Sequence, residues 1–329
     1  MPAPKPAYNL AKAKMNRSVW IGLLLGALLL AVGGCKPVAP ATPAAPGKTS
    51  RTAPIKAVTT VAMLEEIVRT VGGDRVEVQA LMGPGVDPHL YRATARDTER
   101  LDQAELIVAV GLHLEGKLDD ILARQTQRGK TVVMAGETIP ESMRLKVEAG
   151  KDDPHIWHDP IRWQEVVDPI REALTKLDPA HADEFTSRAE DYIRAMNELD
   201  GEAELALKGI PEERRVLITA HDAFRYFGDR YKIEVRGIQG INTASEASAR
   251  DIMELADFIV ARKIRAIFVE SSVPPATIEA LQKAVRAQGH QVEVGPALYS
   301  DAMGTPGTPE GNYIGMFRHN IKAISEALK

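Results

Sequence analysis

The sequence has little cysteine and no excess of positive charge. Among its 329 residues there is one cysteine, Cys35, and the formal net charge is −4. A disulfide within the sequence is excluded because it needs two thiols. Nucleic acid is a poor candidate for the main partner, because a surface that follows a phosphate backbone needs an excess of Lys and Arg. Small ligands and other proteins remain as candidate partners.

Two motifs of hydrolytic enzymes are missing as well. The sequence contains neither H-E-x-x-H, the zinc-binding helix motif of many metalloproteases, nor G-x-S-x-G, the nucleophile turn of α/β-hydrolases. Without these signals the sequence favours binding over catalysis, and we predict that the protein is not an enzyme.

The sequence also lacks an apolar run of comfortable membrane-spanning length near its N-terminus. The run from Val19 to Val32 follows a basic region and suits the apolar part of a signal peptide. It leads into V-G-G-C, which is typical of a bacterial lipobox. We therefore expect a lipoprotein signal peptide over residues 1–34 and a lipid on Cys35. An ordinary signal peptide followed by a chance cysteine is the alternative, and the liability of a lone exported thiol disfavours it.

Residues 36–54 are rich in Pro and Ala and show no hydrophobic periodicity. Such a segment cannot bury enough surface to fold and serves as a semi-stiff tether. We expect the lipidated cysteine and this tether over residues 35–54, with the folded body beginning at Ile55.

Short β-branched runs, separated by helical patterns, occur in two parts of the sequence. Strands that alternate with helices indicate βαβ units and a parallel sheet. We therefore predict an α/β fold of two βα lobes, residues 55–178 and residues 210–329, each with a mostly parallel sheet. The runs are 55–61, 76–82, 106–110 and 131–135 in the first lobe and 216–220, 233–238, 266–270 and 292–298 in the second.

A longer helical pattern separates the two lobes. Residues 179–209 continue to Gly201 without a helix breaker, and Pro179 suits the first turn of a helix. A helix of this length measures about 40 Å, enough to run the height of a domain. We predict that it joins the lobes and that the ligand site lies in the cleft between them.

Helix starts are marked in the second lobe by two pairs of residues with capping-box spacing. Thr243 with Glu246 and Ser248 with Asp251 both place an acidic residue three positions after a hydroxyl residue. In a capping box the two side chains satisfy backbone N–H groups at a helix N-terminus. We expect both pairs to act in this way.

Four polar segments lie at the ends of predicted strands or just before a helix, and each offers one strong metal donor. Ligands of open α/β sheets bind at the carboxyl ends of strands. Neutral imidazole and carboxylate are the usual ligands of Zn²⁺, Mn²⁺ and Fe²⁺. The sequence therefore predicts a metal site, with two donors from each half of the chain. The donors are His89, either His155 or His158, His221, and Asp301.

The segment DDPHIWHDP contains two histidines that compete for one ligand position. His155 ends an Asp-Pro-His tripeptide, as His89 does, so the two imidazoles could be presented alike, with each Asp free to support them. His158 lies one helical turn beyond, where a chelating pair is conceivable. Pro154 and Pro160 disfavour a regular helix through the segment. We therefore prefer His155 as the ligand and expect His158 to lie nearby without binding.

The chain carries, in this order, GVDPHLY, DPHIWHDP, AHDAFRYF, GINTASEASARDI, IFVESSV and ALYSDAMG. Together these segments resemble the TroA-like cluster A-I (cluster 9) solute-binding proteins, the metal-binding lipoproteins of ABC importers for zinc and manganese. The resemblance covers nearly everything from Ile55 to Lys329. It implies two βα lobes bridged by one rigid long helix, with a single divalent metal between them. Its ligand set, carried over position by position, is His89, His155, His221 and Asp301.

Two departures from the pattern of this family concern the identity of the metal. Many manganese-specific relatives have Glu at the third ligand position, where this chain has His221. Many zinc-specific relatives have a long His-rich loop, and nothing between Asp119 and Asp152 is rich in His. The two departures point in opposite directions, so the resemblance implies Zn²⁺ or Mn²⁺ without choosing between them.

Three further residues are candidates for supporting the ligands. Glu270 ends a predicted strand and could accept the second N–H of a ligand imidazole, with helix capping or lobe packing as the alternative. His113 follows the predicted strand 106–110 and could reach the cleft, where we expect a supporting or packing role. His158 is the third candidate.

The function implied by the resemblance is transport. We expect a monomer that captures Zn²⁺ or Mn²⁺ outside the cytoplasmic membrane and delivers it to an ABC permease with its ATPase. It would be lipid-anchored in the bacterial cell envelope, on the outer face of the cytoplasmic membrane or in the periplasm. Two alternatives are a surface adhesin and a surface metallohydrolase, and the latter needs an open coordination position beside a general base.

Overall fold

The computed structural model describes residues 51–147 and 150–329. The predicted signal peptide, the lipidation site Cys35 and the tether up to residue 50 lie outside these residues. Within the described ranges, each helix is too short or too polar to cross a membrane. We call residues 55–178 the N-terminal half and residues 210–329 the C-terminal half, and the predicted division into lobes at these boundaries stays a prediction.

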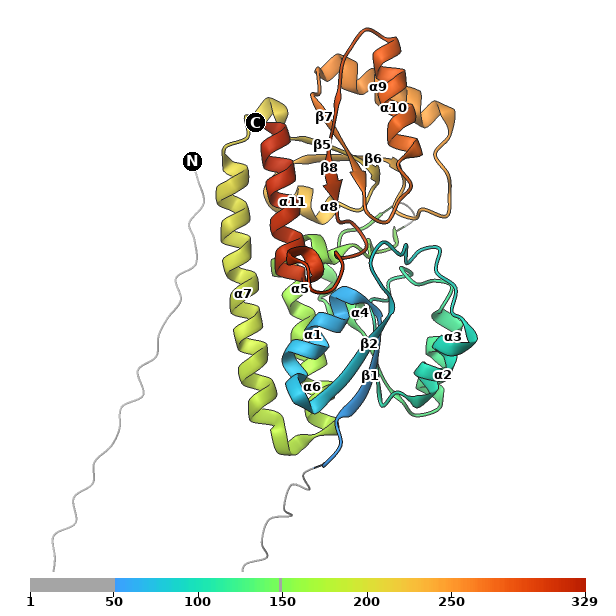
Figure 1. Cartoon of the computed structure of the whole chain (residues 1–329), viewed down its shortest axis with the longest axis vertical. Helices are drawn as coiled ribbons and strands as arrows, with labels where there is room; N and C mark the ends of the chain where they lie inside the picture. Colours follow the sequence, from blue (N-terminus) through green and yellow to red (C-terminus); the bar gives the residue numbers. More distant parts are fainter. Residues whose placement is uncertain (1–50, 148–149) are drawn as a thin grey trace, which may run out of the picture. The chain divides into compact units, whose positions relative to one another are not determined.

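The N-terminal half is built on a four-stranded parallel sheet in the order β2-β1-β3-β4. Figure 1 shows helices α1 and α6 on one side of this sheet and α2 and α3 on the other. Helices on both faces explain why β3 is apolar and buried throughout and why every residue of β1 except Lys56 is buried. The elements are β1 (Ile55–Val61), α1 (Ala62–Gly72), β2 (Val76–Met82), α2 (Ala95–Gln103), β3 (Leu106–Ala109), α3 (Asp119–Gln127), β4 (Thr131–Met134), α4 (Ala135–Thr138), α5 (Pro160–Trp163) and α6 (Val167–Leu177).

The C-terminal half contains two parallel pairs of strands. Strand β5 pairs with β6, and β7 pairs with β8. All of these strand pairs are parallel, as the alternation of strands and helices predicts, but they do not join into one sheet as in the N-terminal half. The elements are β5 (Val216–His221), α8 (Arg225–Tyr231), β6 (Glu234–Gln239), α9 (Ala249–Arg262), β7 (Ala266–Glu270), α10 (Ala276–Ala287), β8 (Glu293–Leu298) and α11 (Tyr313–Leu328).

Helix α7 (Ala182–Lys208) is 27 residues long and runs along both halves (Figure 1). It begins after Pro179–His181, which forms a 3₁₀ turn, and it continues through Gly201. Its buried residues recur every three or four positions, which places them on one face of the helix. They are Phe185, Ala189, Tyr192, Met196, Leu199, Asp200, Ala203 and Leu207.

The apolar core links the two halves. One cluster of buried residues contains the sheet of the N-terminal half, the buried face of α7 and residues of α8 and α11, including Phe227 and Phe317. A second, smaller cluster lies among the strands of the C-terminal half and helices α9 and α10. Because close-packed cores deform little, the shared cluster limits how far the halves move relative to one another.

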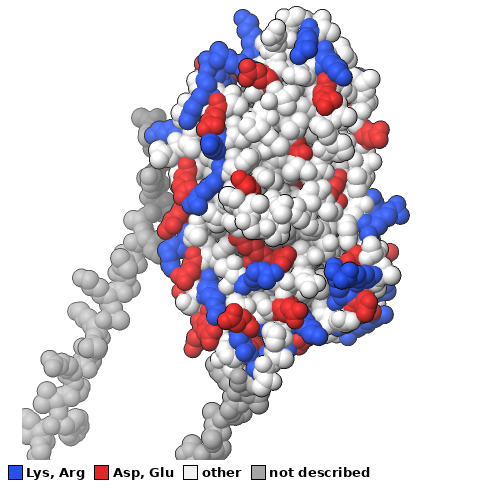
Figure 2. Space-filling model, in the orientation of Figure 1, with Lys and Arg blue, Asp and Glu red and all other residues white. Residues whose placement is uncertain are grey.

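Charges of both signs are mixed on the face shown in Figure 2, where Lys and Arg lie among Asp and Glu. A surface that follows a phosphate backbone would gather positive charge along one stripe. The view therefore agrees with the net charge of −4 in giving no support to nucleic acid as a partner.

Two helical glycines provide a test of the packing. At Gly201 an added Cβ meets nothing within 4 Å, whereas at Gly228 it would lie 2.6 Å from the Ile233 carbonyl oxygen. Gly201→Ala should raise the free energy of unfolding by about 0.5 to 1 kcal/mol, because Ala loses less backbone entropy on folding. Gly228→Ala should lower it by about 1 to 3 kcal/mol through overpacking. Urea unfolding followed by circular dichroism measures both, and shifts in the same direction would contradict this packing.

Candidate metal centre

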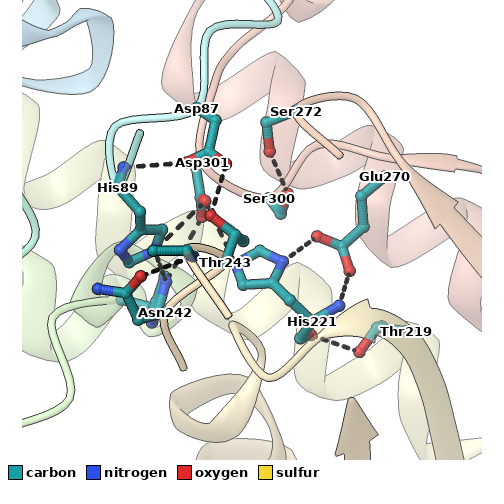
Figure 3. A network of polar contacts seen from close by, with 12 residues as sticks. Asp87, His89, Thr219, His221, Asn242, Thr243, Glu270, Ser272, Ser300 and Asp301 are labelled. Atoms are coloured by element: carbon teal, nitrogen blue, oxygen red, sulfur yellow. Dashed lines mark hydrogen bonds and ion pairs between the residues drawn. The ribbon is translucent and has the colours of Figure 1, made fainter. Parts of the chain in front are cut away.

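Four side chains that the sequence predicts as donors meet in one buried cluster. His89, His155, His221 and Asp301 each offer one ligand atom, and these atoms all lie within 4.8 Å of one another. Figure 3 shows His89, His221 and Asp301 turned toward one another from different segments of the chain. The N-terminal half supplies the first two donors and the C-terminal half the other two.

Strand ends and tight turns place these donors. His221 is the last residue of β5, and Asp301 lies just beyond the end of β8. His155 precedes a short 3₁₀ turn, and His89 lies in the loop between β2 and α2. Gly237 on the neighbouring strand β6 allows close approach, since a Cβ there would lie 2.5 Å from the His221 carbonyl carbon.

The donor atoms are close enough to share one ion. The Nε2 atoms of His89 and His155 are 3.2 Å apart. The nearest Asp301 carboxylate oxygen lies 3.2 Å from Nε2 of His221, 3.6 Å from that of His155 and 3.7 Å from that of His89. Nε2 of His221 and both Asp301 carboxylate oxygens have no hydrogen-bond partner among the described residues. Buried polar atoms are normally satisfied, so this set of donors fits a bound cation.

Electrostatics distribute charge unevenly within the cluster. Burial lowers the pKa of His89 to about 3, so that imidazole is neutral near pH 7. Burial alone would also lower the pKa of His221, but the carboxylates of Glu270 and Asp301 outweigh it and raise that pKa well above its usual value. Burial likewise opposes ionisation of Asp301, and the neighbouring imidazoles, His221 above all, lower its pKa in spite of it. The cluster therefore contains one carboxylate anion, Asp301, and one readily protonated imidazole, His221.

Two of the imidazoles are oriented by carboxylates. Nδ1 of His155 lies 2.8 Å from an Asp153 oxygen, and Nδ1 of His221 lies 2.5 Å from a Glu270 oxygen. The second oxygen of Glu270 accepts a hydrogen bond from the His221 backbone N–H at 2.8 Å. A proton held on Nδ1 leaves Nε2 free to bind a metal. The structure thus places the predicted supporting residue Glu270 directly against His221.

The two Asp-Pro-His tripeptides share one local hydrogen bond. Oδ1 of Asp87 accepts from the His89 backbone N–H at 2.8 Å, and Oδ1 of Asp153 accepts from the His155 N–H at 3.0 Å. Each Asp therefore fixes the backbone of the histidine that follows it. Only Asp153 also contacts the imidazole ring of its own tripeptide.

His158 is buried close by but belongs to a different contact. Its ring lies on that of Phe224, with centroids 4.1 Å apart and a tilt of 30°. Neither of its ring nitrogens has a hydrogen-bond partner in the described part of the chain. Burial lowers the pKa of His158 to about 3, so the ring packs as a neutral aromatic group.

His113 lies apart from the cluster. Its side chain is 72% exposed, and its Nδ1 is 3.3 Å from an Asp119 oxygen. Gly111, Leu112 and His113 all have positive φ, so the chain turns sharply after β3 and carries this side chain to the surface. The structure thus places His113 at the surface, whereas the sequence analysis expects a supporting or packing role for it.

Trp157 is a contributor to the site that the sequence did not indicate. Its ring N–H donates to the Ser300 carbonyl at 2.7 Å, and its own carbonyl accepts from the Tyr313 hydroxyl at 2.8 Å. Ser300 precedes Asp301 and also exchanges a 2.8 Å hydrogen bond with Ser272. These contacts fix the backbone that carries Asp301 to the N-terminal half.

Thr243 does not form the capping box that its spacing predicts. Its hydroxyl donates to Oδ2 of Asp87 at 2.6 Å, and this hydrogen bond joins the C-terminal half to the N-terminal half. The second predicted box is correct, because Ser248 and Asp251 cap helix α9. Local spacing cannot distinguish a hydroxyl used in a cap from one used in a contact that is distant in sequence.

Comparisons with known proteins agree on one family. The family model for ZnuA, described as zinc-uptake complex component A, periplasmic, matches residues 57–327. The zinc-binding protein TroA of Treponema pallidum is 49% identical over 271 residues, which cover 82% of this chain and 88% of that protein. The manganese-binding lipoprotein MntA of Bacillus subtilis is 44% identical over 271 residues, with the same coverage of 82% and 88%.

A solved structure shares the fold. The periplasmic zinc-binding protein TroA from Treponema pallidum superposes with a TM-score of 0.82 at 48% sequence identity, covering 84% of this chain and 99% of that chain. These matches confirm the predicted two-part α/β fold with its long helix and the predicted resemblance. The chain belongs to the ZnuA/TroA family of metal-binding, solute-binding lipoproteins of zinc and manganese ABC importers, a family of transport proteins rather than enzymes.

Proposed function

We propose that this protein captures one Zn²⁺ or Mn²⁺ ion with His89, His155, His221 and Asp301 and delivers it to an ABC permease for import. The observation that carries the proposal is the convergence of these four buried donors within 4.8 Å. The names of two relatives, a zinc-binding protein and a manganese-binding lipoprotein, support the choice of cargo.

The donor set suits holding a metal rather than catalysing with it. Four protein ligands complete the tetrahedral shell that structural zinc sites use, whereas catalytic sites keep one position for water or substrate. Burial supports the same conclusion, since His155 and His221 are fully buried. The metallohydrolase alternative also conflicts with membership of a family of transport proteins.

The choice between the two metals follows from donor chemistry. Three imidazole nitrogens and one carboxylate form a nitrogen-rich set, and Zn²⁺ binds such sets more tightly than Mn²⁺ in the Irving–Williams order. We therefore expect the isolated protein to prefer Zn²⁺, whichever metal the cell supplies for import.

The partners and location belong to the same proposal. A lipid on Cys35 would hold the protein at a membrane of the bacterial cell envelope, facing the periplasm or the outer face of the cytoplasmic membrane. Its partners would be a permease and the ATPase that drives it, and the protein would act as a monomer. The names of the relatives support this location, since one is called periplasmic and another a lipoprotein.

The competing histidines supply a first test. His155→Ala should weaken Zn²⁺ binding by more than about 100-fold, the upper end of what losing a mere supporting residue costs. His158→Phe keeps the aromatic contact with Phe224 and should remain within about tenfold of the unchanged protein. Competition with a chromophoric chelator measures both affinities. The opposite order of the two variants would show that His158 is the ligand.

The dependence of affinity on pH supplies a second test. A metal must displace the proton on His221, whose pKa is raised, while His89, with a pKa near 3, carries no proton to lose near pH 7. Affinity should therefore fall as the pH drops from about 8 to about 6, and metal binding should release the proton of His221. Calorimetry in buffers of different ionisation enthalpy counts the protons. A flat affinity over this range would contradict the assignment of His221.

A further inference from the structure

The three imidazoles of the site are not held equally. Nδ1 of His155 and Nδ1 of His221 each lie against a buried carboxylate, Asp153 and Glu270 respectively. Nδ1 of His89 is buried and has no hydrogen-bond partner among the described residues. The ring of His89 is therefore the least restrained.

The loop that carries His89 is anchored to its own half at Tyr91, whose hydroxyl donates to Asp97 at 2.7 Å, and its other hydrogen bonds to that half are long. Residues 83–91 belong to the connection between β2 and α2 and form neither a helix nor a strand. Val86 N–H reaches the Gly83 carbonyl at 3.3 Å, and Lys117 reaches the Leu90 carbonyl at 3.4 Å, both near the long limit of a hydrogen bond. Leu90, next to His89, is 47% exposed, so the loop faces solvent beside the site.

A shorter hydrogen bond ties this loop to the opposite half. The Thr243 hydroxyl donates to Oδ2 of Asp87 at 2.6 Å, while Oδ1 of Asp87 accepts from the His89 backbone N–H at 2.8 Å (Figure 3). Thr243 is buried, so the bond is shielded from water. A hydrogen bond to an ionised acceptor is roughly twice as strong as a neutral one. Asp87 thus joins the backbone of His89 to the segment between β6 and α9.

The matching residue Asp153 is used differently. Its Oδ1 accepts from both the backbone N–H and Nδ1 of His155, and its side chain is fully buried. Asp153 therefore restrains the imidazole ring itself, whereas Asp87 restrains only the loop. Withdrawing His155 would break a buried carboxylate–imidazole contact, whereas withdrawing His89 breaks no contact of this kind and would open the Asp87–Thr243 bond.

We propose that residues 83–91 are the gate of the metal site, that His89 is the first ligand to leave the metal, and that the Thr243 hydroxyl on Asp87 controls how fast the gate opens. Asp87 and Thr243 are positioning residues that act through His89. The inference rests on the proposed function, because it requires His89 to be a ligand. Opening the gate leaves the metal with three ligands and one position facing solvent, through which a receiving protein or a chelator can reach it.

Release kinetics of the Zn²⁺-loaded full chain test the gate. Mixing with a large excess of a chromophoric chelator in a stopped-flow instrument gives a release rate that no longer depends on chelator concentration. Thr243→Val removes the hydroxyl but keeps the shape of the side chain, and should release Zn²⁺ about tenfold faster, as expected for losing a hydrogen bond to a charged group. Thr243→Ser keeps the hydroxyl and should stay within about twofold of the unchanged protein.

A matched control lies in the same segment. Ser245 is exposed, and its hydroxyl makes no hydrogen bond among those of the described residues, so Ser245→Ala should leave the release rate unchanged. If thermal unfolding shows that Thr243→Val does not fold, Thr243→Ala removes the same hydroxyl and takes its place.

The rate of metal binding separates a gate from a purely structural role. Because binding retraces the path of release, Thr243→Val should accelerate both, and the Kd should change by less than about threefold. A residue that merely shaped the site would raise the release rate alone and weaken Kd by the same factor. That result, or a release rate for Thr243→Val equal to those of the unchanged protein and Ser245→Ala, would overturn the gate.

Different results would contradict the proposed function and the proposed gate. If the unchanged protein does not bind one Zn²⁺ per chain, or if His89→Ala binds it as tightly, the ligand set itself is wrong. If binding is intact and depends on His89 but the Thr243 variants behave alike, only the gate is wrong.

Discussion

The structure depends on the burial of several ionisable donors in a space that one ion can fill. His89, His155, His221 and Asp301 bring their donor atoms within 4.8 Å of one another, and the Asp301 carboxylate has no hydrogen-bond partner in the described ranges. Unpaired polar groups in an apolar interior are costly. A divalent cation coordinated by all four donors would remove that cost, so the buried donor set favours metal binding.

The scaffold keeps the donors together by packing across both halves. Helix α7 and the C-terminal helix α11 share an apolar cluster with the first sheet, and Trp157 hydrogen-bonds the Ser300 carbonyl next to Asp301. Such packing leaves little freedom for the halves to separate as rigid bodies. Under the proposed gate, metal release therefore needs a local movement. The segment that moves is the loop of residues 83–91, which carries His89.

Sequence patterns predict which residues are donors, but they predict less well the contacts that position those donors. His89 and His155 each end an Asp-Pro-His tripeptide, and His221 ends an apolar strand, so strand periodicity and a repeated motif identify all three. The partner of Thr243 is 156 residues away in the sequence, and local spacing favours a capping box instead. His113 lies outside the cluster for a related reason. Residues 111–113 all have positive φ, which turns its side chain to the surface, and residue types alone do not predict that turn.

The central claim is that three imidazoles and one carboxylate form the shell around the metal. X-ray absorption spectroscopy of the Zn²⁺-loaded protein tests it most directly. The ligand set predicts four light-atom neighbours at about 2.0 to 2.2 Å, with the outer-sphere scattering of three imidazole rings. A shell with fewer than three imidazoles, or with a sulfur neighbour at about 2.3 Å, would contradict it.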